Sequence, residues 1–355
     1  MSHSTRRIGR VLERFSGRRV LILGDAMLDH YIWGESSRIS PEAPIPIVTV
    51  SEESSRLGGA ANVAHNIRVL GGEALLVSVI GPDEAGRQLT DTLSRQGIAT
   101  DSLVVDPDRP TVKKSRVIAR SQQVVRLDRE RTDELSGPVL EQLSERIRVA
   151  LARAHAIVIS DYGKGVICKP LLDTWLPRFN GSGLPVCVDP KETHFHSYRG
   201  VTVLTPNLGE ASFAAGTRIR DEASLESAGR ALLRQLGAHH LLITRGEEGM
   251  SLFTEGSPRM DIAAVGREVY DVTGAGDAVV GALALALAAG ASMEEATRLA
   301  NHAAGRVIRE LGTSTVTREE ILESWANGES SESREAPAHA EESPPVPSKP
   351  DARPD

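Results

Sequence analysis

The chain has 355 residues, 40% of them apolar, which is enough for one large domain with a full-sized core. Its formal charge is −7 and its basic residues are dispersed along the chain, so the composition argues against a nucleic-acid-binding groove. The two cysteines, Cys168 and Cys187, are too few for a disulfide scaffold and form no Cys-x-x-Cys pair, so we expect a protein of the reducing cytoplasm without a zinc or redox site.

Neither a secretory signal nor a membrane span is expected. Residues 1–15 contain arginines but no apolar segment after them, unlike a signal peptide. The longest uncharged stretch, residues 278–293, is shorter than the roughly 20 residues that a membrane span needs. We therefore interpret it as a buried helix.

Apolar strand-like runs alternate with helical patterns along most of the chain. The predicted strands are 19–24, 74–81, 156–160, 185–189, 201–206 and 240–244. Helical periodicity is found at 59–70, 84–96, 138–153 and 221–236. Nearly continuous apolar strands separated by helices indicate a parallel sheet that is covered on both faces. The expected fold is an α/β, three-layer αβα sandwich with a mainly parallel central sheet.

Two regions break this alternation, residues 31–57 and 102–128. They carry β-branched pairs, prolines and alternating polarity, but no helical period. We expect antiparallel strands that stand off the main sheet as a small β lid.

The composition changes near the carboxyl end of the chain. Residues 327–355 are rich in proline, glutamate and serine and cannot bury enough apolar area to offset their ordering entropy. We expect one folded domain over residues 1–326 and a disordered tail over 327–355.

Two motifs near the start of the chain suit a polyhydroxylated ligand. Asp25 follows the first predicted strand and Asp29 lies four residues later, where carboxylates in open α/β sheets meet ligands, although one of the two could simply cap a turn. Gly58 and Gly59 precede a helix of small residues with Asn62 in its first turn. Tight packing would explain the glycines equally well, but it would not explain Asn62.

Further polar residues follow later strands. Asn207 and Glu210 are three residues apart, which suits either a site for magnesium-bound water and nucleotide phosphates or plain helix capping. Arg245, beyond the strand at 240–244, and Lys191, beyond the strand at 185–189, suit nucleotide phosphates, although surface cations are common.

The stretch DVTGAGDAVVGA, residues 271–282, is the most informative. Gly274, Ala275 and Gly276 leave room for main-chain N–H groups to converge on an anion at the start of a helix. Asp277 would then lie within reach of both a phosphate and a substrate hydroxyl, as a general base does in phosphoryl transfer. The alternative is an aspartate that caps an ordinary glycine-rich turn.

The order of these motifs resembles that of the PfkB (ribokinase-like) family of carbohydrate kinases over about residues 18–320. The paired stretches GGAANVAHNIRVLG and DVTGAGDAVVGALALALAAG carry the resemblance. The stretches GDAMLDHYIWGESSRISPEAPIPIV, TVKKSRVIARSQQVVRLD, SDYGKGV and LTPNLGE are most similar to the members that act on D-glycero-β-D-manno-heptose 7-phosphate. These members make the 1,7-bisphosphate for ADP-heptose and the lipopolysaccharide core.

This resemblance implies a ribokinase-like fold, a homodimer formed through the β lid, and the use of ATP and Mg²⁺. We expect no adenylyltransferase domain, to which such kinases are often fused, within these 355 residues. The resemblance implies that Asp277 deprotonates the anomeric hydroxyl and that the amides of Gly274, Ala275 and Gly276 stabilise the transferred phosphoryl group. The residues implied at the nucleotide and magnesium site are Asn207, Leu208, Gly209, Glu210, Lys191, Thr244, Arg245, Gly246 and Asn301, with Asn207 and Glu210 on the metal. Those implied to face the sugar are Asp25, Asp29, Gly58, Gly59, Asn62, Asp161 and Lys164.

The 7-phosphate of such a substrate needs cations of its own. The candidates on the predicted lid strands are Lys113, Arg116, Arg120 and Arg126, of which Lys113 and Arg120 are favoured. The alternative is a solvated basic strand face, because lysine and arginine commonly protect exposed strand edges.

Three other functions were weighed. A kinase for another sugar, sugar phosphate or nucleoside is the nearest alternative. A non-catalytic sugar-phosphate sensor would have no need for Asp277 as a base. A dinucleotide-dependent oxidoreductase would need a Gly-x-Gly-x-x-Gly turn after the first strand, which LGDAMLD lacks.

Overall fold

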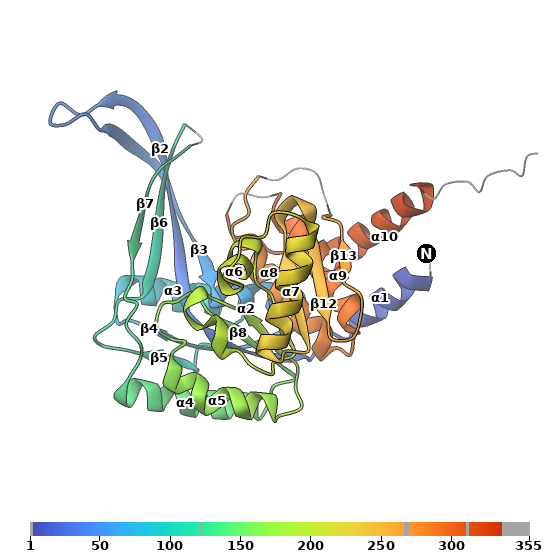
Figure 1. Ribbon diagram of the computed structural model, residues 1–355. Coiled ribbons are helices and arrows are strands. Elements are labelled where there is room, and N and C mark those ends of the chain that lie inside the picture. The colour runs from blue at the N-terminus through green and yellow to red at the C-terminus, as the bar shows by residue number, and fades with distance from the viewer. Residues whose placement is uncertain (1–2, 121, 266–269, 310–311, 336–355) are drawn as a thin grey trace, which may run out of the picture.

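The computed structural model describes residues 3–120, 122–265, 270–309 and 312–335 (Figure 1). Its main sheet has the strand order β13-β12-β11-β10-β9-β8-β1-β4-β5. The strands are β1 (Arg19–Gly24), β4 (Glu73–Ile80), β5 (Leu103–Val105), β8 (Ala156–Ser160), β9 (Val186–Asp189), β10 (Val203–Leu204), β11 (His240–Thr244), β12 (Met250–Thr254) and β13 (Met260–Ile262). The seven strands β11, β10, β9, β8, β1, β4 and β5 run parallel to their neighbours, and β12 and β13 join antiparallel at one edge.

Helices cover both faces of this sheet. On one face lie α1 (His3–Glu13), α2 (Ala60–Val69), α3 (Glu84–Arg95), α8 (Ala275–Ala288), α9 (Met293–Val307) and α10 (Arg318–Glu335). On the other lie α4 (Gly137–Leu151), α5 (Lys169–Asn180), α6 (Leu208–Ala214) and α7 (Glu222–Leu236). Alternate residues of β1 belong to the two cores: Val20 and Ile22 pack on the first face, Leu21 and Leu23 on the second. The predicted three-layer αβα sandwich is therefore confirmed.

The predicted strands agree closely with those observed, with two exceptions. The strand expected over 201–206 is reduced to β10, since Pro206 has no N–H group to donate to a sheet ladder. Residues 103–105, placed in the lid by the sequence, instead form β5 beside β4 in the main sheet.

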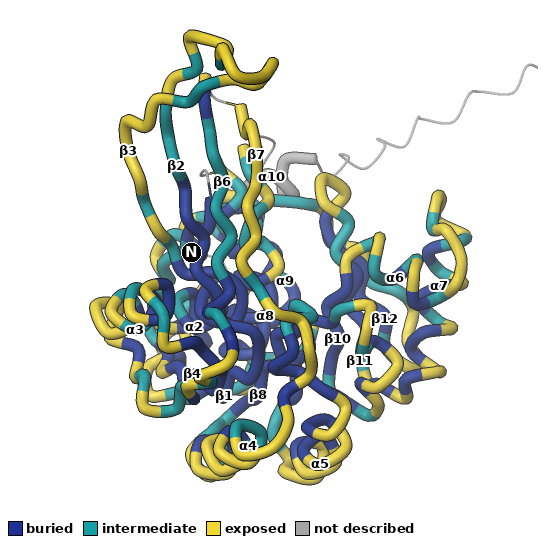
Figure 2. The backbone as a smooth tube through the Cα atoms, turned by 90° about the vertical axis from the view of Figure 1, so that its left-hand side faces the viewer, coloured by how far each residue is buried: buried dark blue, intermediate teal, exposed yellow. Residues whose placement is uncertain are grey.

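The lid is a second sheet, of order β3-β2-β6-β7, that projects from the body (Figures 1 and 2). Its strands are β2 (Ala26–Ile39), β3 (Pro46–Gly59), β6 (Val112–Ala119) and β7 (Gln122–Arg129). The prediction of antiparallel strands is wrong for one pair, because β2 and β6 run parallel. Both leave the body at the same sheet edge and extend outward in the same direction, so an antiparallel pairing was not available to them.

The register between β2 and β6 determines what each lid face carries. Asp29 pairs with Lys114 and Tyr31 pairs with Arg116, so these four side chains share one face. Lys113 and Ser115, which alternate with them along β6, share the opposite face with His30.

Two helices near the carboxyl end bear on earlier predictions. Helix α8 is buried on all sides, as the apolar stretch at 278–293 predicted. Helix α10 continues to Glu335, past residue 327, where the sequence predicts the start of a disordered tail; residues 336–355 lie outside the described residues, so the tail stays a prediction. Within the described part of the chain, no helix is both long and apolar enough to cross a membrane.

Candidate active site at the carboxyl edge of the main sheet

Polar side chains gather where the parallel strands end. Asp161 follows β8, Asp189 ends β9 and Thr244 ends β11, while Asn207 comes shortly after β10. Because these strands are parallel and adjacent, their carboxyl ends meet at one edge. They line a cavity of about 950 Å³ together with Tyr162, Lys191, Glu210, Gly246, Gly274, Ala275, Gly276 and Asn301.

A backbone cradle closes one end of this cavity at the start of α8. Gly274 has φ 82°, a left-handed conformation that suits glycine. A Cβ atom on Gly274 would lie 2.8 Å from the Asn62 amide nitrogen, so a larger residue would displace Asn62. The N–H group of Ala275 donates to the Val272 carbonyl oxygen at 3.2 Å, and the N–H group of Gly276 follows it in the first turn of the helix, where the helix dipole favours an anion.

Asp277 lies just behind this cradle and is 1% exposed. Its Oδ2 accepts a hydrogen bond from Asn62 Nδ2 at 2.8 Å, and its Oδ1 accepts one from the Tyr162 hydroxyl at 2.8 Å. Burial raises the pKa of Asp277 to about 7, while the hydrogen bonds from Asn62 and Tyr162 oppose that rise. A carboxyl group that titrates near neutral pH is suited to general base catalysis.

The residues around Asp29 explain the double glycine of the sequence. Gly58 and Gly59 end β3 where it pairs with the start of β2. A Cβ on Gly58 would overlap the Asp29 carboxylate, and one on Gly59 would overlap the Asp25 carbonyl oxygen. The glycines therefore allow close packing. Asn62 is buried in α2, where it orients Asp277 and receives a hydrogen bond from Asn66.

Asp25, which the resemblance implies to face the sugar, is bound to the backbone of the loop after β8. Its buried carboxylate accepts the backbone N–H groups of Tyr162, Lys164 and Val166 at 2.9–3.1 Å. Burial, with the nearby charge of Asp161, raises its pKa to about 6. Asp25 thus holds the loop after β8, which carries Tyr162 to Asp277.

Asp161, in the same loop, is held by the side chains of Tyr198 and His194. Its Oδ2 accepts hydrogen bonds from the Tyr198 hydroxyl at 2.6 Å and from His194 Nδ1 at 2.9 Å. The bond to Asp161 raises the pKa of His194. Lys164 forms an ion pair with Glu130, 2.7 Å apart, and does not line the cavity.

Asn207 and Glu210 combine helix capping with a place on the cavity wall. They form a capping box at the start of α6, and both also line the cavity. Lys191 Nζ lies 3.4 Å from Glu210 Oε1. The first-turn residues Leu208 and Gly209 do not line the cavity. Asn301 does, and its side chain donates a hydrogen bond to the carbonyl oxygen of Ala263, another lining residue, at 2.7 Å.

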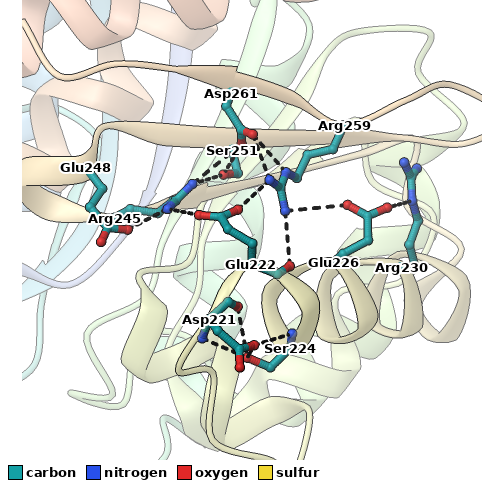
Figure 3. A network of polar contacts seen from close by, with 10 residues as sticks. All are labelled: Asp221, Glu222, Ser224, Glu226, Arg230, Arg245, Glu248, Ser251, Arg259 and Asp261. Carbon is teal, nitrogen blue, oxygen red and sulfur yellow. Dashed lines mark hydrogen bonds and ion pairs between the residues drawn. The ribbon is translucent and has the colours of Figure 1, made fainter.

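Arg245 lies in a network of ion pairs outside the cavity. Its guanidinium lies 2.6 Å from Glu222 and 2.5 Å from Glu248, and it donates to the Ser251 hydroxyl at 3.1 Å (Figure 3). The side chain is 10% exposed and does not line the cavity. These contacts tie β11 and the following loop to α7, and the role of Arg245 in binding nucleotide phosphates stays a prediction that the observed contacts do not support.

Arg245→Gln is therefore expected to lower the free energy of unfolding by about 1–3 kcal/mol, since hydrogen bonds to charged groups contribute about that much. Urea denaturation measures this change. The control is Arg87→Gln, which removes an exposed pair with Glu84 and should cost at most about 0.5 kcal/mol. Equal losses in the two variants would contradict a structural role for Arg245.

Two lid cations lie near Tyr162 and Asp29, and they are not Lys113 and Arg120, the two that the sequence favours. Lys114 Nζ lies 5.4 Å from the centre of the Tyr162 ring, and Arg116 forms a 2.5 Å ion pair with Asp29. Lys113 lies on the opposite lid face, and Arg120 is exposed in the turn between β6 and β7, well beyond Arg116 along the strand. Arg126 pairs with the neighbouring Asp128.

Sequence reasoning missed three residues of the site. Tyr162 stands next to Asp161 in SDYGKGV, Lys114 next to Lys113, and Asp189 opens the DPK stretch from which only Lys191 was chosen. Burial and the charges of Asp277, Glu210 and Asp161 raise the pKa of Asp189 well above its usual range. The position of Asp189 at a strand end was a signal that could have identified it.

Comparisons with known proteins place this geometry among sugar kinases. The sequence profile described as "pfkB family carbohydrate kinase" matches residues 18–320. The bifunctional protein HldE of Pelobacter propionicus is 45% identical over 316 residues, covering 89% of this chain and 65% of that protein. HldE of Geotalea uraniireducens is 47% identical over 304 residues, covering 86% of this chain and 62% of that protein. The chain thus spans less than two thirds of the length of these relatives.

Solved structures show the same fold. Ribokinase of Arabidopsis thaliana, complexed with ribose and ATP, matches with a TM-score of 0.69 at 21% identity, covering 87% of this chain and 98% of that one. Phosphofructokinase-2 of Escherichia coli, in complex with substrates and products, matches with a TM-score of 0.72 at 19% identity, covering 87% and 99%. At these identities the likeness establishes a ribokinase-like fold.

Proposed function

Because the chain belongs to the pfkB family of carbohydrate kinases, we propose that it transfers the γ-phosphoryl group of ATP to O1 of D-glycero-β-D-manno-heptose 7-phosphate. The products would be ADP and the 1,7-bisphosphate. The identity of 45% with the bifunctional protein HldE, which extends over most of this chain, supports this choice of sugar. The observation that carries the proposal is the buried Asp277 carboxylate beside the cradle of α8.

In the proposed reaction, Asp277 accepts the proton of the anomeric hydroxyl as its oxygen attacks the γ-phosphorus. A new O1–P bond forms while the bond between the γ-phosphorus and its bridging oxygen breaks, and ADP leaves with that oxygen. The N–H group of Gly276 would stabilise charge on the transferred group, joined by that of Ala275 if it exchanges the Val272 carbonyl oxygen for the phosphoryl group. Catalysis would rest mainly on positioning and on electrostatic stabilisation.

ATP and Mg²⁺ fit the residues that line the cavity. Asp189, Glu210 and Asn207 offer the oxygen atoms that Mg²⁺ prefers, and the mutual repulsion of Asp189, Glu210 and Asp161 would be offset by a bound cation. Among the described residues, no group of three or more His, Cys, Asp or Glu side chains is arranged to hold a metal ion by itself. The magnesium ion would neutralise charge on the ATP phosphates.

The lid supports a subsite for the 7-phosphate. Lys114 and Arg116 lie on the lid face that carries Asp29, at the end nearest Tyr162. Burial lowers the pKa of Lys114, a cost that a bound anion would reduce. We assign these two residues, in place of Lys113 and Arg120, to the phosphate already present on the sugar.

The opposite lid face supports the proposed homodimer. Val125 pairs with Val117 and Leu127 with Ser115, so Val125 and Leu127 lie on the face away from the site, and both are exposed. A second copy of the lid would cover this apolar surface. Sedimentation equilibrium tests for the dimer.

The cellular location is also a proposal. Cys168 and Cys187 are free thiols and are buried, which suits a reducing cytoplasm where ATP is supplied.

The decisive experiment is a phosphorylation screen with Mg-ATP, read by mass spectrometry. The acceptors are heptose 7-phosphate, fructose 6-phosphate, fructose 1-phosphate, ribose and adenosine. Heptose 1,7-bisphosphate is the expected product. Preferential phosphorylation of another acceptor would replace the proposed substrate, and binding of heptose 7-phosphate without any product would favour a sensor.

A further inference from the structure

Tyr162 covers the proposed base. Its hydroxyl lies 2.8 Å from Asp277 Oδ1, and Asp277 itself is 1% exposed. Asn62 Nδ2 holds the other carboxylate oxygen at the same distance. A sugar hydroxyl must contact this carboxylate directly to lose its proton, but in the structure each oxygen already has a donor.

The two donors differ in their freedom to move. Asn62 is 1% exposed, lies within α2, and is held by Asn66, whose amide donates to both the backbone and the side-chain oxygen of Asn62. Tyr162 lies in a loop, is partly exposed and lines the cavity. Of the two, Tyr162 is the one that can yield its position to a ligand.

We propose that the Tyr162 hydroxyl caps Asp277 in the free enzyme and is displaced when the acceptor hydroxyl binds. Tyr162 is then a positioning residue, whose phenol gives Asp277 the hydrogen bond that the substrate later provides. This inference rests on the proposed function, because it requires Asp277 to act on a hydroxyl group.

The cap has a consequence for the pH dependence of the free enzyme. A donor stabilises the ionised carboxylate, so its loss should raise the pKa of Asp277. The other charged groups near Asp277 are Asp29 on β2, Lys114 on β6 and Asp189 at the end of β9, which a change of Tyr162 to phenylalanine leaves in place. The aromatic ring beneath Lys114 is also retained.

The test compares wild type with Tyr162→Phe over pH 5 to 9. The pH profile of kcat/KM reports groups of the free enzyme and that of kcat reports groups of the complex. We expect the acid limb of kcat/KM to move upward by about one pH unit, a tenfold change in proton affinity, while the acid limb of kcat stays in place. The ionisation of the sugar phosphate is common to both enzymes and does not alter the difference.

Tyr198→Phe is the matched control, because it removes a buried phenol from another carboxylate, that of Asp161. It should move neither limb. An unmoved kcat/KM limb in Tyr162→Phe would overturn the cap, and an equal movement of both limbs would overturn the displacement.

A measurement without substrate separates this inference from the proposed function. Carbon NMR of ¹³C-aspartate-labelled protein, with the Asp277 signal identified by its loss in Asp277→Asn, should show a higher pKa in Tyr162→Phe than in wild type. An unchanged pKa would refute the cap even if the kinase activity is confirmed. A wild-type protein that phosphorylates no sugar would refute the proposed function whatever the pKa.

Discussion

Asp277→Asn is expected to lower kcat by about 10²- to 10⁴-fold, the contribution typical of a general base. The amide cannot take the proton of the anomeric hydroxyl, while the cradle at Gly274–Gly276 remains intact. The KM for ATP and for the sugar should change little, because the substitution removes an interaction made in the transition state. Steady-state kinetics at saturating ATP measure the effect.

The substitution should leave the fold intact. The Tyr162 hydroxyl, which donates to Asp277 in the structure, can equally accept a hydrogen bond from an amide N–H group. Because burial raises the pKa of Asp277 to about 7, the folded state binds this proton more tightly than the unfolded state, and stability is lost as the pH rises from about 4 to 7. Asp277→Asn removes that loss, so at pH 8 its free energy of unfolding should equal or exceed that of wild type. Near-normal turnover in a stable Asp277→Asn protein would exclude Asp277 as the base.

The main fold was predictable because its strands carry a strong local signal. Residues 20–23 of β1 are all apolar and all buried, since helices cover both faces of the sheet. Helix α8 was predictable because its sequence is apolar around the whole helix, as expected of a helix that is buried on all sides. Once parallel strands are inferred, polar residues just after them must meet at one edge, and this argument placed Asp25 and Lys191 there. Asp277 was identified from its glycine-rich motif, and Asp161 from the family resemblance.

The partners of a side chain were less predictable than its position. Arg245 does lie at the end of β11, as predicted, but Glu222 reaches it from α7, 23 residues away in sequence. The sequence next to Arg245 does not reveal that its guanidinium N–H groups are bonded to Glu222. Tyr162 was missed for a related reason, because its bond to Asp277 joins residues 115 positions apart.

The orientation of the lid strands was also not predictable from local sequence. Alternation along 112–119 divides the side chains into two faces, but it does not reveal which face lies toward the site. The pairing of Asp29 with Lys114 decides this, and it joins two distant segments in a parallel register. Without it, Lys113 and Lys114 could not be distinguished.

This distinction leads to the second prediction with a large expected effect. Lys114→Met should raise the KM for heptose 7-phosphate by about 10- to 100-fold, since a charge-assisted hydrogen bond contributes about 1.5–3 kcal/mol. The KM for ATP should stay the same, because Lys114 does not line the nucleotide cavity. Methionine keeps much of the aliphatic stem of lysine, so the change mainly removes the charge.

Lys113→Met is the matched control. It is the same substitution at the adjacent residue, with similar partial exposure, but on the opposite lid face. It should change the KM by no more than about twofold. A larger effect at Lys113 than at Lys114 would reverse the assignment of the lid faces.

The chemical form of the acceptor separates two possible roles of Lys114. If Lys114 binds the 7-phosphate, Lys114→Met should lose most of the preference for heptose 7-phosphate over unphosphorylated heptose, and kcat should be largely retained. If it instead contacts the phosphoryl group in transfer, kcat should fall for both acceptors and the preference should persist, because the lost interaction would then be common to both reactions. Lys114 lies over the Tyr162 ring and its charge also acts on Asp277, so the acceptor preference, rather than position alone, distinguishes the two roles.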